Sequence, residues 1–216
     1  MGFFSDVVAR IRGVGQSGLS GAEPVDWVVV GLGNPGVRYA STRHNVGYMV
    51  IDELLGAVEL LPLRGFKASG AVIEVGGRRV LVVRSSTFMN TSGEAVGPIS
   101  QEYGVSPDHV VVVHDELDLP AHKVRVKVGG NENGHNGLKS VSQWLGTRDY
   151  VRIRVGIGRP PRGETVPDYV LGALDSGEVL DAAVRCGADA VRLVVERGVS
   201  VAQNEIHRRR LRGGWG

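Results

Sequence analysis

The stretch VVVGLGNPGVRYASTRHNVGY, residues 28–48, decides how the rest of the chain is interpreted. Its valines predict a buried strand, and the strand runs into G-x-G-x-x-G from Gly31, the spacing of a dinucleotide-binding turn. Such a turn also needs a helix that begins inside the motif and an acid at the end of a second strand. Here helical spacing begins only near Asn45, and the acids at a suitable distance, Asp52 and Glu53, fall inside that helix. A dehydrogenase is therefore a minor alternative.

The remaining sequence alternates between strand-like and helix-like segments. Strands are expected at 27–32, 71–75, 79–83, 110–113, 123–128 and 150–157, and helices at 45–60, from 91 or 92 towards 103, at 138–145 and at 178–196. Gly76-Gly77 indicates a hairpin turn, and Pro98 weakens the case for a continuous second helix. The pattern predicts an α/β fold: a single globular domain with a twisted mixed β-sheet flanked by helices.

Composition points to one core and one compartment. The 216 residues are 42% hydrophobic, and a net charge of +2 does not by itself indicate a nucleic-acid binder. The single cysteine, Cys186, excludes an internal disulfide, and no apolar stretch reaches the length of a membrane span, so we expect a cytoplasmic protein. We expect a flexible leader at 1–24, the α/β domain at 25–206 and a basic tail at 207–216.

Several polar side chains fall in loops at the ends of the predicted strands. They are Asn34, Tyr39, His44, Asn90, Asp115, His135 and Asn136. Each alone has an ordinary structural explanation, such as a helix N-cap for Asn136. Together, at one edge of a sheet, they favour a hydrolytic site without a serine or cysteine nucleophile. The acids that follow His114 lack the regular spacing of a metal loop, so we expect no metal and no cofactor.

In several blocks the sequence resembles bacterial peptidyl-tRNA hydrolases. The matching blocks occur in the family's order, and they are GLGNPG at 31–36, Tyr39 with TRHNVG at 42–47, FMNTSGEAV at 88–96, HDELDLP at 114–120, GHNGLKS at 134–140 and RVGIGRP at 154–160. The family hydrolyses the ester between a peptide and the terminal ribose of tRNA, which recycles tRNA from peptidyl-tRNA released by ribosomes. The resemblance implies the same reaction and a monomer.

The resemblance also implies a role for each matching residue. His44 is the base that activates water, Asp115 holds its imidazole in the basic tautomer, and Asn34 is associated with telling a blocked α-amino group from a free one. A positioned base contributes roughly 10²–10⁴-fold to the rate, and an amide donor to the oxyanion about 10²–10³-fold more. Asn90 and Asn136 are both candidates for that donor.

Substrate binding is implied for a second set of residues. Tyr39, Phe88, Asn90 and Asn136 match residues that contact the tRNA end or the peptide, Met89 lines the same cleft, and Lys127 and Arg154 match residues that contact tRNA phosphate. Lys127 and Arg154 lie on alternating strand patterns that, in an arbitrary protein, indicate only a solvated face.

One segment departs from the family pattern. The family usually has a nearly all-glycine run before its HNG, whereas residues 129–137 read GGNENGHNG, and Glu132 places a negative charge near the expected RNA site. The runner-up function is an inactive RNA-binding relative of the same fold that serves splicing. The presence of Asn34, His44 and Asp115 favours the enzyme.

Overall fold

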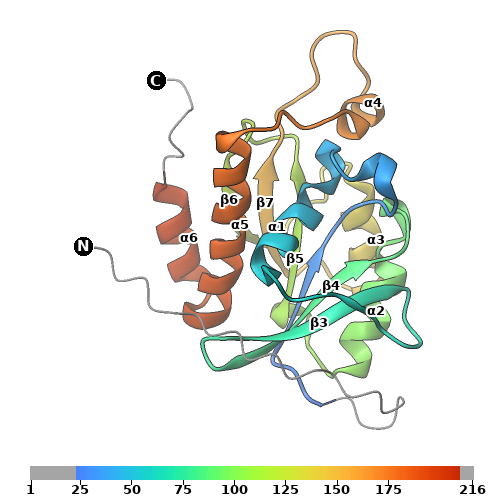
Figure 1. The fold of residues 1–216 in the computed structure, drawn as a ribbon, viewed down its shortest axis with the longest axis vertical. Helices are drawn as coiled ribbons and strands as arrows, with labels where there is room; N and C mark the ends of the chain where they lie inside the picture. Colours follow the sequence, from blue (N-terminus) through green and yellow to red (C-terminus); the bar gives the residue numbers. More distant parts are fainter. Residues whose placement is uncertain (1–22, 210–216) are drawn as a thin grey trace.

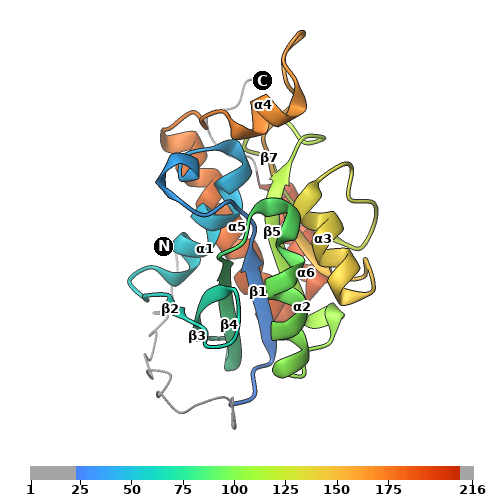
Figure 2. The same cartoon turned by 90° about the vertical axis from the view of Figure 1, so that its right-hand side faces the viewer.

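The structure, a computed structural model, describes residues 23–209. One seven-stranded mixed sheet lies between two layers of helices (Figures 1 and 2), which confirms the predicted α/β class. The strands are β1 Trp27–Gly31, β2 Leu61–Pro62, β3 Ala68–Val75, β4 Arg78–Ser85, β5 Val110–Glu116, β6 Val124–Val128 and β7 Val151–Gly156. The helices are α1 Val46–Leu55, α2 Gly93–Glu102, α3 Asn136–Leu145, α4 Val166–Leu171, α5 Glu178–Arg197 and α6 Val199–Arg208, with 3-10 turns η1 Val37–Tyr39, η2 Arg43–Asn45, η3 Met89–Thr91 and η4 Pro107–His109.

The strand order places the carboxyl ends of the central strands side by side. The order is β2-β3-β4-β1-β5-β7-β6, in which β1 is parallel to β4 and β5, and β5 is parallel to β7. The antiparallel strands β3 and β6 pair with β4 and β7. Because parallel strands end at the same edge of a sheet, the turns that follow β1 and β5 meet there.

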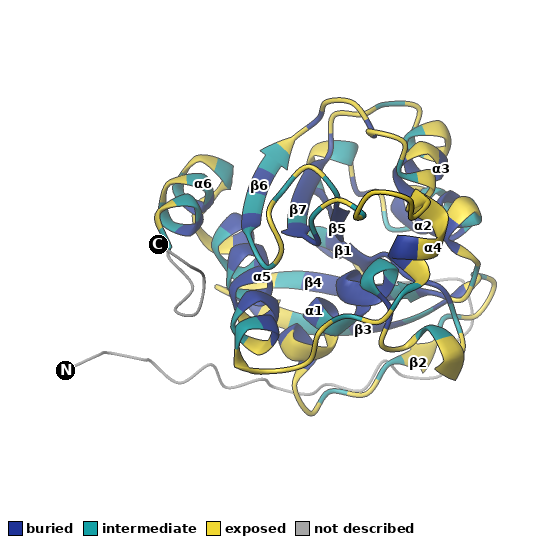
Figure 3. Cartoon of the chain, turned by 90° about the horizontal axis from the view of Figure 1, so that it is seen from above, coloured by how far each residue is buried: buried dark blue, intermediate teal, exposed yellow. Residues whose placement is uncertain are grey.

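Each face of the sheet is covered by its own apolar core. Val29 and its neighbours pack under α1 and α5, whereas Val28 and Val30 pack under α2 and α3. Figure 3 shows the buried central strands between these layers. Central strands that are covered on both faces explain why β1 and β5 are nearly continuous runs of valine.

The first turn of α1 lies unusually close to the ends of β1 and β5. A Cβ atom at Gly47 would lie 2.6 Å from the carbonyl oxygen of Leu32 and 2.4 Å from that of Val113. Only glycine permits this approach. The contact fixes the start of α1, and with it the preceding turn η2, against the edge where the strands end.

Several element boundaries differ from the expected ones. Helix α1 ends at Leu55 rather than near residue 60 because Gly56 takes a positive φ of 58°. Helix α2 is continuous through Pro98, with Val96 and Ile99 fully buried on either side of it. The short elements β2 and α4 and helix α6 were not predicted from the sequence.

Helix α6 covers the edge of the sheet. The backbone N–H of Val126 donates to Nε2 of His207 at 3.0 Å, and Gln203 donates to the carbonyl of Val126 at 3.2 Å, so side chains occupy backbone groups that an edge strand leaves free. The helix ends at Arg208, which means that the first two residues assigned to the basic tail are helical. Residues 1–22 of the expected leader and 210–216 of the tail lie outside the described residues. Within the described chain, no helix is both long and apolar enough to cross a membrane.

Candidate active site

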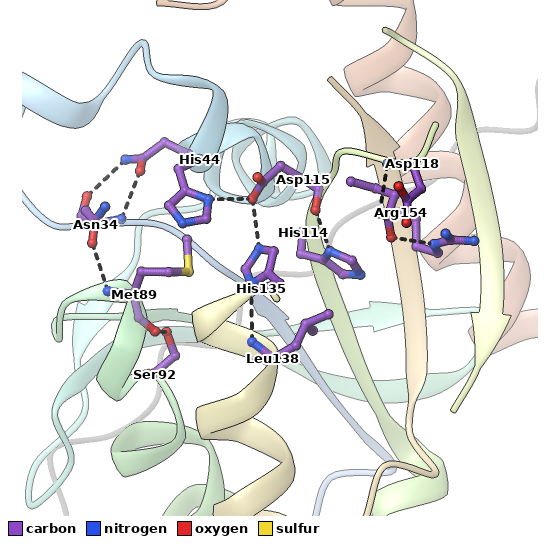
Figure 4. A network of polar contacts seen from close by, with 12 residues as sticks. Asn34, His44, Met89, Ser92, His114, Asp115, Asp118, His135, Leu138 and Arg154 are labelled. Carbon is purple, nitrogen blue, oxygen red and sulfur yellow. Dashed lines mark hydrogen bonds and ion pairs between the residues drawn. The ribbon is translucent and has the colours of Figure 1, made fainter. Parts of the chain in front are cut away.

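Three side chains meet where β1 and β5 end (Figure 4). His44 lies in turn η2, directly before α1; Asp115 lies near the end of β5; and His135 lies directly before α3. Nδ1 of His44 is 2.8 Å from Oδ1 of Asp115, and Nε2 of His135 is 2.9 Å from the same oxygen. The structure therefore brings together two residues that are 71 positions apart in the sequence, as expected for this edge of the sheet.

Asp115 is a carboxylate at neutral pH even though only 2% of it is exposed. Burial by itself raises the pKa of Asp115, but the charges and hydrogen bonds of His44 and His135 outweigh it and hold that pKa well below its usual range. An ionised carboxylate only accepts hydrogen bonds, so Nδ1 of His44 carries a proton. Nε2 of a neutral His44 is then left with a free lone pair, and the side chain is 12% exposed.

Asn34 is fixed by three hydrogen bonds. Its backbone N–H donates to Oδ1 of Asn45 at 2.8 Å, its carbonyl accepts from Nδ2 of Asn45 at 2.9 Å, and its side-chain oxygen accepts from the N–H of Met89 at 2.8 Å. Because the bond from Met89 fixes which end of the amide is the oxygen, Nδ2 is the donor that Asn34 can offer to a ligand. Asn45 is fully buried; it belongs to the matching block TRHNVG at 42–47, but no role was predicted for it from the sequence.

The residues expected to bind substrate divide into exposed and buried side chains. Phe88 is 57% exposed and meets Tyr39 edge-to-face, with 6.4 Å between ring centres. Asn90 and Asn136 are exposed, in turn η3 and at the first position of α3. Met89 is buried, so its backbone bond to Asn34 is its clearest contribution.

The two strands expected to bind phosphate place basic residues side by side. Antiparallel pairing sets Lys127 of β6 opposite Arg152 of β7, and Arg125 opposite Arg154. Nε of Arg154 donates to the buried carboxylate of Glu116 at 2.9 Å, which neutralises part of its charge. Lys127 is partly exposed, and its ammonium group lies close to the loop at Gly130.

Arg152 has a structural task that its strand pattern does not reveal. Only 2% of it is exposed, and its guanidinium donates to the carbonyls of Gly130 and Asn131 at 2.8 and 2.9 Å. These bonds hold the loop that leads to His135. The alternating pattern of this strand, which in an arbitrary protein indicates a solvated face, does not reveal that Arg152 is buried.

Glu132 in the same loop is also paired rather than directed at solvent. It is 8% exposed, and its Oε1 accepts from Nε of Arg148 at 2.7 Å. Burial raises the pKa of Glu132, but the hydrogen bond from Arg148 leads a set of interactions that leave it below its usual value. The expected adverse charge is therefore largely offset by its partner, and the loop is fixed.

His44, Asp115 and His135 offer ligand atoms within 4.8 Å of one another, close enough to suggest a metal site. However, Nδ1 of His135 accepts from the backbone N–H of Leu138 at 3.2 Å. The proton of the neutral ring must then lie on Nε2, the atom that faces Asp115. A protonated nitrogen cannot bind a metal, so this donor set fits a hydrogen-bond network better than a cation.

Comparison with known proteins identifies the family of this chain. Residues 28–213 match the family described as peptidyl-tRNA hydrolase. The chain is 54% identical over 186 residues to peptidyl-tRNA hydrolase 2 of Corynebacterium glutamicum, covering 85% of this chain and 88% of the relative, and 48% identical over 191 residues to the Mycobacterium avium peptidyl-tRNA hydrolase, covering 86% and 98%. The crystal structure of peptidyl-tRNA hydrolase from Acinetobacter baumannii superposes with a TM-score of 0.79 at 34% identity, covering 87% of this chain and 98% of that one. This chain belongs to the peptidyl-tRNA hydrolase family.

Proposed function

We propose that this chain hydrolyses the ester between a peptide and tRNA, with His44 as the base that activates water. The observation that carries the proposal is the 2.8 Å contact between Nδ1 of His44 and the ionised Asp115, which leaves Nε2 to take a proton. Asp115 then stabilises the imidazolium that forms, as a carboxylate does in a catalytic triad. An ester has a better leaving group than an amide, so activated water suffices and no covalent intermediate is needed.

Asn34 supports a preference for peptides over free amino acids. Its Nδ2 donor can bond to a carbonyl, which an acylated α-amino group carries next to its nitrogen. A free aminoacyl group has a charged ammonium there instead, which is also a donor and cannot accept the bond. The fixed orientation of the Asn34 amide would thus favour a blocked substrate.

Asn136 is the better supported of the two oxyanion donors. It is exposed, it follows His135 directly, and it begins helix α3, whose N-terminal end favours negative charge. Asn90 lies in a separate turn with Phe88, which suits contact with the tRNA end or the peptide. Lys127 is the best placed group for a phosphate near the tRNA end, and Arg154 lies on the neighbouring strand β7, two residues along from the residue that pairs with Lys127.

The substrate is a product of translation, so the proposed activity belongs in the cytoplasm. One chain supplies His44, Asp115 and Asn34, so the proposed site is complete in a monomer.

The test compares the release of amino acid from N-acetyl-aminoacyl-tRNA and from free aminoacyl-tRNA, with a chelator present. The expected result is cleavage of the blocked substrate alone and its loss in His44→Ala, with tRNA affinity retained. Strong residual activity in His44→Ala would remove His44 as the base. Binding of tRNA without cleavage by the wild-type chain would favour the RNA-binding alternative.

A further inference from the structure

We propose that His135 is a positioning residue, which fixes the carboxylate of Asp115 with one ring nitrogen and caps helix α3 with the other. The proposal rests on the hydrolytic function proposed above and adds a residue to its machinery. His135 contacts neither the attacking water nor the ester in this scheme. It acts through Asp115, and so through the orientation of His44.

Hydrogen bonds hold the His135 ring in one tautomer. The backbone N–H of Leu138 donates to Nδ1, so Nδ1 keeps a lone pair and Nε2 carries the proton that is donated to Asp115 (Figure 4). Both ring nitrogens are therefore in use. His135 cannot serve as a second base without breaking the cap or the bond to Asp115, which separates its task from that of His44.

Both histidines bond to the same oxygen of Asp115. With two donors on Oδ1, the carboxylate is held in one rotation and its charge is shared between two N–H groups. Without His135, the carboxylate of Asp115 has one fewer restraint, so a smaller fraction of His44 rings is correctly oriented. The negative charge of Asp115 also acts on His44 alone, which stabilises the protonated form of His44.

Four titratable or charged groups from three other elements lie around His135 or the pair that it serves. His44 comes from η2, with 5.0 Å between the two ring centres, and Asp115 and His114 come from β5, with 5.1 Å from the His114 ring centre. Arg152 of β7 acts on His114. Burial and the neighbouring His135 hold the pKa of His114 near 3, so His114 stays neutral when enzyme activity is measured.

Two substitutions separate the tasks of the ring. His135→Asn puts an amide oxygen near the position of Nδ1, where it can accept from Leu138, but the side chain is too short to reach Asp115. His135→Gln puts an amide nitrogen near the position of Nε2, where it can donate to Asp115, but it lacks the cap. Each variant is thus the matched control for the other.

The experiment measures kcat and KM with N-acetyl-aminoacyl-tRNA across a range of pH, together with the Tm of each variant. His135→Asn is expected to lose about tenfold or more in kcat with little change in KM. Its acid limb of kcat/KM should move to higher pH, and its Tm should stay at the wild-type value. His135→Gln should keep kcat within about threefold and the wild-type acid limb, but its Tm should fall by about 2–4 °C through the lost cap.

A His135→Asn variant with wild-type kcat and a wild-type acid limb would overturn the proposal. So would losses of kcat that follow Tm in both variants, because His135 would then only stabilise α3. A wild-type chain that fails to cleave the substrate would count against the proposed function instead, so the two failures are distinguishable.

Discussion

Replacing His114 with asparagine is expected to make the free energy of unfolding depend less on pH in the acidic range. The His114 ring is fully buried; its Nδ1 donates to the carbonyl of Asp115 at 2.7 Å, and its Nε2 has no hydrogen-bond partner among residues 23–209. Burial, and after it the neighbouring His135, lower the pKa of His114 from 6.5 to about 3. Between these values the unfolded chain binds a proton that the folded chain does not, so stability falls as pH decreases.

The size of the effect follows from the width of that window. One pH unit is worth about 1.4 kcal/mol for each proton, so His114 alone removes about 2–3 kcal/mol between roughly pH 6.5 and pH 4.5. Asp115 does not disturb this interval. Its lowered pKa adds stability that is fully present above the unfolded pKa of about 3.9 and is lost only as pH falls below that value.

The assay is urea unfolding of the wild type and His114→Asn at several pH values across that interval. Asparagine is suitable because its amide can still donate to the carbonyl of Asp115. The wild type should be the more stable protein at neutral pH, and its advantage should shrink by about 2–3 kcal/mol towards pH 4.5. The contribution of His207, whose pKa is also lowered by burial, is common to both proteins and cancels. Two parallel curves of unfolding free energy against pH would refute the reasoning.

Three further sets of substitutions test the site and its surroundings. Asp115→Asn should lower the single-turnover rate constant by about 10³-fold, because that factor corresponds to the loss of roughly 4 kcal/mol of attraction between the carboxylate and the imidazolium that forms on His44; a loss under about tenfold would contradict the role of its charge. Lys127→Ala should reduce the slope of log tRNA affinity against log salt by about 0.7–0.9, and Arg154→Ala by less, since its partner on β5 already offsets its charge; equal slopes would show that the pairing does not matter. Glu132→Gly should lower Tm by several degrees, because it removes the buried carboxylate that accepts a hydrogen bond from the exposed Arg148, whereas Asn133→Gly, at a positive φ of 48° that suits glycine, should not; equal Tm values would show that the pair does not hold the loop.

The central strands could be predicted well because strands that are buried on both faces have continuous apolar sequences. Runs such as Val110–Val113 are apolar on both faces, and the pair Gly76-Gly77 fixes the turn between β3 and β4. Boundaries set by single backbone conformations were harder to predict. Helix α1 ends where Gly56 takes a positive φ. The sequence does not show whether a glycine inside a helical pattern takes that conformation.

The site could be predicted as a gathering of residues but not as a network. Strand order brings His44 and Asp115 together, and strand ends are visible in the sequence. The partner of a polar side chain is not visible there. Arg152 lies on the same alternating pattern as Arg154, yet one guanidinium holds a loop and the other faces Glu116. Likewise, no pattern shows which nitrogen of His135 carries the proton.

The strand order also means that the sheet under the site is completed late in the order of the chain. Strand β5, which carries Asp115, lies between β1 and β7, and β7 ends only at Gly156. Until Val151–Gly156 has left the ribosome, β5 lacks one neighbour and the two halves of the dyad rest on an incomplete sheet. Throughout that time the growing chain is itself joined to tRNA by an ester of the kind that the proposed reaction breaks. Because β7 completes the central sheet, the strand that carries Asp115 has both of its neighbours only after the chain has been made as far as Gly156.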